Sequence, residues 1–199
     1  MIRLEEEGGL RIAVIDRPDK AGSLTGAMLR DLAEIAEGSQ GARALILTGT
    51  GKVFSAGADL DEAGAGLATD PVWERLSGAI AALPCLTIAA LNGTLAGGAF
   101  GMALACDLRV AVPGAKFFYP VMKLGFLPQP SDPGRLRALV GPSRAKLILM
   151  AGERMTAEAA LAAGLVDALD DDPVARARIW AEDALAADPA HVAAIKAMI

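Results

Sequence analysis

Residues 85–112 read CLTIAALNGTLAGGAFGMALACDLRVAV and decide the fold. The segment opens with an apolar run of strand length, Cys85–Leu91, and closes with a second one, Leu108–Val112. Between the two runs lie the turn dipeptide Asn92-Gly93 and a short helical stretch after Gly97. Strands without polar alternation are covered on both faces, which is typical of parallel strands joined by helices. The segment therefore predicts an α/β layered domain with parallel strand pairing.

The same segment raises the alternative of a membrane helix. It belongs to an uncharged run of 31 residues, Leu76–Cys106, which is longer than the roughly 20 residues that a membrane helix needs. Three of its glycines even fall at four-residue spacing, as in closely packed membrane helices. Pro84 and the Asn92-Gly93 turn interrupt the run, however, and no remaining piece is long enough to span. We therefore expect no membrane span.

Strands and helices alternate from the N-terminus to about residue 130. The apolar runs Leu10–Asp16 and Ala42–Thr48 predict strands. Helical spacing predicts helices over Thr25–Glu37, where Thr25 is the N-cap, and over Pro71–Leu83. We expect a β/α core over residues 1–130.

The pattern changes to helices without intervening strands from about Ser131. The predicted helices are Arg135–Val140, Ser143–Ala151, Ala157–Ala163 and Val174–Ala187. Residues 131–199 are therefore expected to form a helical C-terminal part.

Composition and charge exclude several classes of protein. The chain has 199 residues, a length that is enough to bury a core without disulfides or metal. Of these residues 53% are hydrophobic, but only 4% are aromatic. Its net charge is −5, and it lacks the basic stripe of a nucleic-acid binder. Cys85 and Cys106 lie in apolar runs and are expected to be buried thiols in a reducing compartment. The N-terminus has no signal-peptide pattern, so we expect a cytoplasmic protein. The single histidine and the spacing of the two cysteines predict that there is no metal site.

Two glycine-rich junctions follow buried strands, at Thr48–Leu60 and at Asn92–Gly101. Neither fits the phosphate-loop or dinucleotide-binding spacing. Serine chemistry at Ser55 would depend on the single histidine, His191, which stands near the chain end and is expected to lie on a helix surface. One N–H group from each junction, aimed at one point, would instead form an oxyanion hole, which stabilises an enolate or a tetrahedral intermediate.

These residues resemble the enoyl-CoA hydratase/isomerase (crotonase) family from Asp16 to Leu169. The pairing of F-S-A-G-A-D-L with N-G-x-x-x-G-G at this separation is highly specific. The matching pieces are DRPDK at 16–20, GKVFSAGADL at 51–60, LNGTLAGGAFGMALACDLRVA at 91–111, F-x-Y-P at 117–120, L-G-F-L-P at 124–128 and MTAEAALAAGLVDAL at 155–169.

The resemblance implies a spiral of ββα turns that assembles into trimers, often paired as hexamers, and binds acyl-CoA thioesters. It implies that the N–H groups of Ala58 and Gly98 form the oxyanion hole for the thioester carbonyl, with Gly98 opening a helix over residues 98–105. Coenzyme A then enters as part of the substrate, and no separate cofactor is expected.

The resemblance also implies a set of substrate-binding positions. Ser23 and Ala56 match the stretch that lines the adenine pocket. Lys20 and Lys52 stand where the family places cations near the coenzyme A phosphates, although an ordinary surface charge is the alternative for each. The other positions in the matching motifs are Asp59, Leu60, Gly97, Gly101, Pro120, Val121 and Gln129.

The chain departs from the family at both positions where hydratases carry a catalytic glutamate. The first is Gly101 here, and the second is Val121, directly after Pro120. Gln129 stands where dienoyl-CoA isomerase relatives carry an aspartate, and an amide cannot transfer protons in that way. Without an acid/base pair, addition of water to an enoyl-CoA loses its main proton carriers.

Two other groups are candidate acids or bases, Tyr119 and Asp132. The alternatives are a half-buried core tyrosine for Tyr119 and a helix N-cap for Asp132. Asp59 is expected to be a structural loop carboxylate. The predicted function is thus nominally that of an enoyl-CoA hydratase/isomerase, with other enolate chemistry (decarboxylation or thioester hydrolysis) and non-catalytic acyl-CoA binding as alternatives. The family continues several dozen residues beyond the helix that contains Lys196, so we expect a short or shortened C-terminal part.

Overall fold

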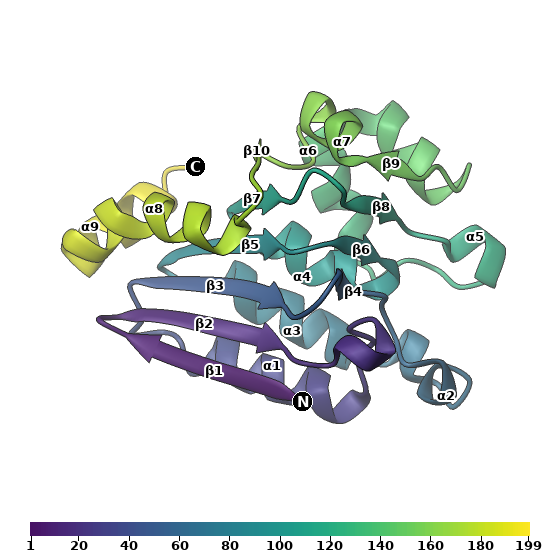
Figure 1. Ribbon diagram of the computed structural model, residues 1–199, viewed down its shortest axis with the longest axis horizontal. Helices are drawn as coiled ribbons and strands as arrows, with labels where there is room; N and C mark the ends of the chain where they lie inside the picture. The colour runs from purple at the N-terminus through teal and green to yellow at the C-terminus, as the bar shows by residue number, and fades with distance from the viewer.

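The computed structural model describes residues 1–199 and is built on two β-sheets with helices on both faces (Figure 1). The main sheet has the strand order β1-β2-β3-β5-β7-β10, in which β1 and β2 are antiparallel and all other pairs are parallel. Its strands are β1 (Ile2–Glu7), β2 (Leu10–Ile15), β3 (Ala44–Gly49), β5 (Leu86–Leu91), β7 (Leu108–Ala111) and β10 (Ala168–Leu169).

A second, smaller sheet continues the turns of the chain beyond the main one. Its order is β4-β6-β8-β9, parallel except for the last pair. The strands are β4 (Val53–Ser55), β6 (Thr94–Ala96), β8 (Lys116–Phe118) and β9 (Met155–Thr156). Because β4 follows β3 and β6 follows β5, the second sheet collects the segments that leave the carboxyl ends of the main strands (Figure 1).

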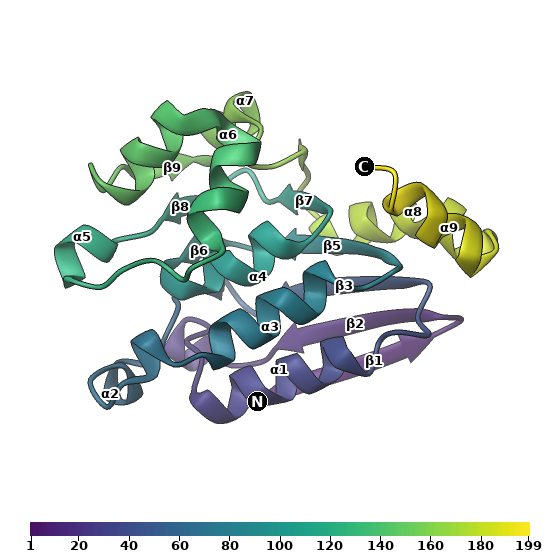
Figure 2. The ribbon, with the colours of Figure 1, turned by 180° about the vertical axis from the view of Figure 1, so that it is seen from behind.

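Helices cover both faces of the main sheet. On one face lie α1 (Gly26–Glu37), α3 (Val72–Ala81) and α4 (Phe100–Ala105), which are in front of the strands in Figure 2. On the other face lies α8 (Pro173–Ala186), which contacts β3, β5 and β7 and is followed by α9 (Pro189–Lys196). The remaining helices are α2 (Leu60–Ala63), α5 (Val121–Leu124), α6 (Asp132–Leu149), α7 (Ala157–Ala163) and the 3-10 turns η1 (Pro18–Lys20), η2 (Leu67–Thr69) and η3 (Gly97–Ala99).

The central strands are apolar throughout because both of their faces are buried. In β5, Ala89 and Leu91 belong to the large core of 43 buried residues on the α1/α3/α4 side. Ile88 and Ala90 belong to the core of 10 buried residues that Ala177 and Ala181 of α8 help to cover. This arrangement confirms the α/β fold with parallel pairing that was predicted from the apolar runs.

Most predicted elements are present, and several short ones were missed. The N-cap of α1 is Thr25, whose side chain accepts a hydrogen bond from the Met28 amide, as predicted. The predicted break after Val140 is present as Gly141 at φ 78°, a non-helical residue inside α6. The strands β1, β4, β6, β8, β9 and β10 were not predicted, so the expectation of no strands after residue 131 was wrong for β9 and β10. These two strands have two residues each, too few for any periodicity.

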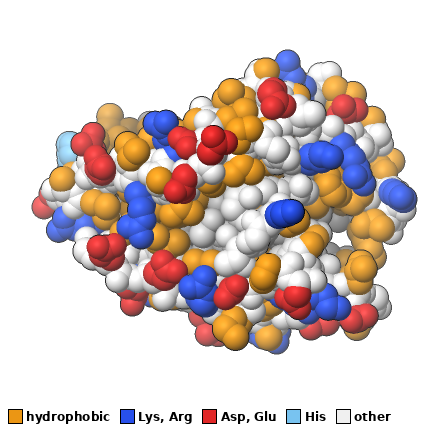
Figure 3. Space-filling view, in the orientation of Figure 1, with side chains coloured by type: hydrophobic (Ala, Val, Ile, Leu, Met, Phe, Trp, Pro, Cys, Tyr) orange, Lys and Arg blue, Asp and Glu red, His pale blue; other side chains and the backbone are white.

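No helix of this structure is long and apolar enough to cross a membrane. The uncharged run that raised this alternative is divided among α3, β5, β6, η3 and α4. On the face in Figure 3, acidic and basic side chains are interspersed over most of the surface, and several basic ones lie close together toward the right.

Candidate functional site

The two glycine-rich junctions meet beyond the carboxyl ends of β3 and β5. The strands β4 and β6 that follow them are paired in parallel, with Ser55 opposite Leu95. A Cβ atom on Gly57 would lie 3.0 Å from the carbonyl oxygen of Ala96 and 3.4 Å from the amide nitrogen of Gly98. Gly57 has φ +92°, so both the backbone conformation and the close approach require glycine at this position.

The amide of Ala58 is left without a hydrogen-bond partner by the pairing of its neighbours. Leu24 forms an isolated parallel bridge with Ala58. In this bridge the Leu24 amide donates to Gly57 O at 2.8 Å, and Leu24 O accepts from the Asp59 amide at 2.8 Å. Because successive amides of an extended segment point to opposite sides, the N–H of Ala58 points away from Leu24. The Gly97–Gly98 turn packs against Gly57 next to it.

Gly98 is held in place by an aromatic ring. It is the second residue of η3, where amides have no partner within the helical turn. A Cβ atom here would lie 3.4 Å from the indole ring of Trp73. The ring is fixed because its Nε1–H donates to Leu67 O at 2.8 Å. The backbone amides of Ala58 and Gly98 therefore lie on adjoining turns.

Polar contacts fix the turn that carries Ala58. The Ser55 hydroxyl is fully buried, donates to Gly22 O at 2.7 Å and accepts from the Gly57 amide at 3.2 Å. Asp59 pairs with Arg17 at 2.8 Å and caps α2 by accepting from the Asp61 amide. Asp59 thus has the structural contacts expected of a loop carboxylate.

Arg17 also binds the neighbouring Ser23, which matches the adenine-pocket stretch of the family resemblance. Its guanidinium donates to Ser23 O at 3.1 Å and to Ser23 Oγ at 3.3 Å. Burial tends to raise the pKa of Asp59, but the Arg17 guanidinium and the amides that the carboxylate accepts from hold this pKa below its usual range. Asp59 is therefore ionised near neutral pH.

A buried carboxylate occupies the space beside Gly101. A Cβ atom on Gly101 would lie only 2.9 Å from Asp132 Oδ1, and Asp132 is 1% exposed. The Asp132 side chain does not cap α6, because Ser131 is the N-cap residue and Asp132 is the first helical residue. The helix-cap alternative for Asp132 is therefore wrong.

Tyr119 is the hydrogen-bond partner of this carboxylate. Its hydroxyl donates to Asp132 Oδ2 at 2.9 Å and accepts from the Gln129 amide at 3.3 Å. The ring stacks on Phe100 with centroids 5.4 Å apart. At 3% exposure Tyr119 is fully buried, not half-buried as the alternative had it. The two candidate acid/base groups of the sequence analysis are therefore in direct contact.

Burial dominates the titration of this pair. It raises the pKa of Asp132 to about 7, against the partly compensating hydrogen bond from Tyr119. Burial, reinforced by the charge of Asp132, raises the pKa of Tyr119 far above its usual range. Near neutral pH, Asp132 can thus be a carboxylate or a carboxylic acid, while Tyr119 is only a neutral hydrogen-bond donor.

The other predicted substrate-binding residues lie on the segments around these two clusters. Val121 is buried at the start of α5, directly after the half-buried Pro120. The Gln129 side chain is buried and donates to Ala68 O at 3.0 Å, so its amide is already engaged. Ala56 and Leu60 are exposed near Ala58 in the chain.

Lys20 and Lys52 are both exposed and stand on adjoining turns. A Cβ atom on Gly51 would lie 3.0 Å from the side chain of Pro18, the first residue of η1. The turn that carries Lys52 therefore packs against the turn that carries Lys20.

The residues of the serine-hydrolase alternative do not come together. Ser55 is buried in β4, whereas His191 lies on α9, at the opposite end of the molecule (Figures 1 and 2). There it lines an apolar groove of about 730 Å³ between α8, α9 and the ends of β5 and β7. Cys85 and Cys106 are buried and unpaired, and burial raises the pKa of the Cys106 thiol to about 12.

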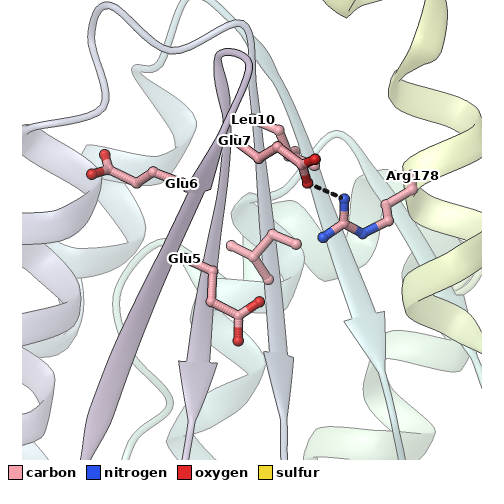
Figure 4. Close-up of a pocket in the computed structure, with 6 residues that line it drawn as sticks. Glu5, Glu6, Glu7, Leu10 and Arg178 are labelled. Atoms are coloured by element: carbon pink, nitrogen blue, oxygen red, sulfur yellow. Dashed lines mark hydrogen bonds and ion pairs between the residues drawn. The ribbon is translucent and has the colours of Figure 1, made fainter.

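One further hollow, of about 240 Å³, lies where the β1–β2 hairpin faces α8 (Figure 4). It is lined by three consecutive glutamates, Glu5–Glu7, and by Arg178, which pairs with Glu7 at 3.3 Å. No residue of the predicted site belongs to it.

Trp73 and Arg17 support the two turns but were not identified from the sequence. Trp73 could have been noticed as one of only two tryptophans, at an apolar position of a predicted helix. Arg17 stands in the DRPDK motif, but no pattern indicated that its partner would be Asp59.

The chain is similar to known proteins over nearly its full length. The family model described as "Enoyl-CoA hydratase/isomerase" matches residues 5–199. A relative from Mycobacterium tuberculosis strain H37Rv, named "Probable enoyl-CoA hydratase EchA14", is 37% identical over 205 residues, covering 98% of this chain and 80% of the relative.

Solved structures agree with this similarity. The structure of Pseudomonas aeruginosa DspI has a TM-score of 0.91 at 30% identity and covers 98% of this chain and 84% of its own. An enoyl-CoA hydratase from Bacillus anthracis has a TM-score of 0.90 at 30% identity, with 98% of this chain and 80% of the other covered.

Proposed function

Since the chain belongs to the enoyl-CoA hydratase/isomerase family, we propose that it binds an acyl-CoA thioester and polarises its carbonyl with the amides of Ala58 and Gly98. The contact between the two glycine-rich turns carries this proposal, because it brings an unpaired Ala58 amide next to the start of η3. Backbone amides are suited to the task because they are preorganised and need no proton transfer of their own.

Polarisation of the carbonyl makes enolate chemistry possible at this site. Negative charge that develops on the thioester oxygen would be held by the two amides, and removal of one such donor typically costs about 3 kcal/mol of barrier. A neighbouring C–H bond thereby becomes easier to break or to form. The chain supports this step without relying on any side chain at position 101 or 121.

The coenzyme A part of the substrate is assigned to the turns of Lys20 and Lys52. Both lysines are exposed on adjoining turns, where two ammonium groups can bind phosphate oxygens. Ser23 and Ala56 adjoin these turns in the chain and are proposed to line the adenine pocket. Trimeric or hexameric assembly and cytoplasmic location stay predictions.

Carbonyl polarisation is tested with crotonyl-CoA that carries ¹³C at the thioester carbonyl. Binding is measured by calorimetry, the carbonyl signal by NMR, and turnover on the same sample. We expect binding with a downfield shift of the carbonyl signal. Ala58→Pro removes the N–H donor and should abolish the shift, whereas the matched Ala58→Gly variant keeps the amide and the shift. Binding without any carbonyl shift in the native chain would contradict the proposal.

The rate of crotonyl-CoA hydration distinguishes a hydratase from the other candidate functions. Hydration no faster than in buffer, with the shift intact, would favour other enolate chemistry or acyl-CoA binding without turnover. Rapid hydration would show that groups other than the two family glutamates activate water here, because Gly101 and Val121 have no carboxylate.

A further inference from the structure

We propose that Asp132 is the catalytic residue that removes and returns a proton at the carbon next to the thioester carbonyl, acting from the space that Gly101 leaves open. This inference rests on the proposed function, since the proton becomes acidic only when the carbonyl is polarised. The proton carrier would then come from α6, because Gly101 on α4 and Val121 on α5 have no group that can transfer a proton.

The carboxylate of Asp132 lies against α4, next to Gly101. Gly98 and Gly101 are three residues apart on the helical segment that runs from η3 into α4, and residues at this spacing share a face. Asp132 Oδ1 lies 2.9 Å from where a Cβ of residue 101 would be. The carboxylate therefore lies beside the helical segment that begins with the Gly98 turn.

One oxygen of this carboxyl has no partner. Oδ2 accepts the Tyr119 hydroxyl at 2.9 Å, but Oδ1 is buried without any hydrogen bond. An unpaired buried carboxyl oxygen is costly, and native structures contain only a few such atoms. Because Oδ2 is engaged by Tyr119, the proposal assigns proton transfer to Oδ1.

Tyr119 is a positioning residue that fixes which oxygen is free. Its hydroxyl is oriented from the other side by the Gln129 amide, and its ring is stacked on Phe100. The charged groups that face the carboxyl are Glu74 from α3, which raises its pKa, and Arg135 from α6, which lowers it. With burial as the largest influence, the pKa of Asp132 is about 7, which suits a group that must both take and give a proton near neutral pH.

The step is balanced without a co-reactant. Asp132 Oδ1 takes the proton as the C–H bond breaks, and the electron pair moves into the thioester as an enolate. The enolate then takes a proton back from the carboxylic acid, at the same carbon or at a conjugated one, and a C–H bond forms again. In D₂O the carboxylic acid exchanges with solvent between these events, so deuterium enters the substrate.

Deuterium uptake by butyryl-CoA in D₂O, followed by proton NMR, tests this role. We expect exchange by the native chain with a rate that rises with pH to a plateau above about 7. Asp132→Asn should slow exchange at least about 100-fold while binding and the ¹³C carbonyl shift persist. The control is Asp172→Asn, the same change at the N-cap of α8, which should leave exchange unchanged.

Gly101→Ala provides a second variant that keeps Asp132. Its methyl group would stand 2.9 Å from Oδ1 and must displace the carboxyl, so exchange should fall at least about tenfold. This variant carries the test if Asp132→Asn fails to give a cooperative thermal transition.

Three outcomes overturn the proposal. The first is native-rate exchange by a folded Asp132→Asn variant. The second is no exchange by a native chain that still shifts the carbonyl signal, which leaves the proposed function standing. The third is no carbonyl shift at all, in which case the proposed function fails and this inference fails with it.

Discussion

The two sides of the site are built from different parts of the chain. The side proposed to bind the carbonyl consists of main-chain amides on two glycine-rich turns, fixed by strand pairing and by Trp73. The opposite side consists of side chains, Asp132 and Tyr119, that are brought in from α6 and from the segment after β8.

The difference teaches which properties each side depends on. The amides need only a backbone path, so the identity of neighbouring side chains matters little as long as they are small. The carboxylate depends on one burial environment and one hydrogen bond, so its charge state is sensitive to every group around it. Disturbing each side separately should therefore change different observables.

The largest expected effect is that of Asp132 on the pH dependence of the free energy of unfolding. Its pKa is about 7 when folded, compared with 3.8 for an unperturbed aspartate. The folded chain thus retains a proton that the unfolded chain loses between these values, so this group destabilises the fold as pH rises. Asp132→Asn should remove a pH-dependent loss of about 4 kcal/mol between pH 4 and pH 8. Urea denaturation of both chains across this range measures the difference, and parallel curves would contradict the burial of a titrating carboxyl.

The second-largest expected effect concerns the contact between the two glycine-rich turns. Gly57→Ala places a Cβ 3.0 Å from Ala96 O in a backbone at φ +92°, which should push the two turns apart. We expect the loss of about 3 kcal/mol of transition-state stabilisation, seen as slower deuterium exchange and a smaller ¹³C carbonyl shift. Gly64→Ala is the control, because no atom lies within 4 Å of its Cβ position and its φ is −65°. If Gly57→Ala kept the full carbonyl shift, Ala58 would not be a donor.

The smallest expected effect tests whether Tyr119 stabilises the Asp132 carboxylate. Tyr119→Phe removes the hydrogen bond that lowers the pKa of Asp132, so this pKa should rise further. The pH midpoint of deuterium exchange should move upward by up to about one unit, and the plateau rate should fall modestly. An unchanged midpoint would mean that Tyr119 does not orient or stabilise the carboxylate.

Much of the fold could be predicted from the sequence because long elements have clear periodicity and clear ends. The strand β5 is apolar on both faces, and α1 has an N-cap residue at Thr25. The strand β1 was missed although Ile2 and Leu4 alternate with exposed residues before the Gly8-Gly9 turn. Strands of two or three residues, such as β4 and β9, are set by their neighbours and have no signal of their own.

The candidate site also has a part that the sequence indicates and a part that depends on the tertiary structure. The turns that carry Ala58 and Gly98 could be located because the motif around each contains the glycines that a tight turn needs, and the role of the two amides stays a prediction. Tyr119 and Asp132 could be named as candidates, but their contact depends on how the segment between β8 and α6 folds back. Spacing along the chain does not show that Asp132 fills the space next to Gly101.

That shared space couples two positions that are 31 residues apart in the sequence. A side chain at 101 and a carboxylate at 132 compete for one volume, so substitutions at the two positions should show epistasis. Gly101→Ala should be harmful beside Asp132 and nearly neutral in a chain that also carries Asp132→Gly. Across related sequences, we therefore expect either a side chain at the position of Gly101 or a carboxylate at the position of Asp132, but not both. A mutational route from one arrangement to the other then passes through a chain that has no carboxylate at either position.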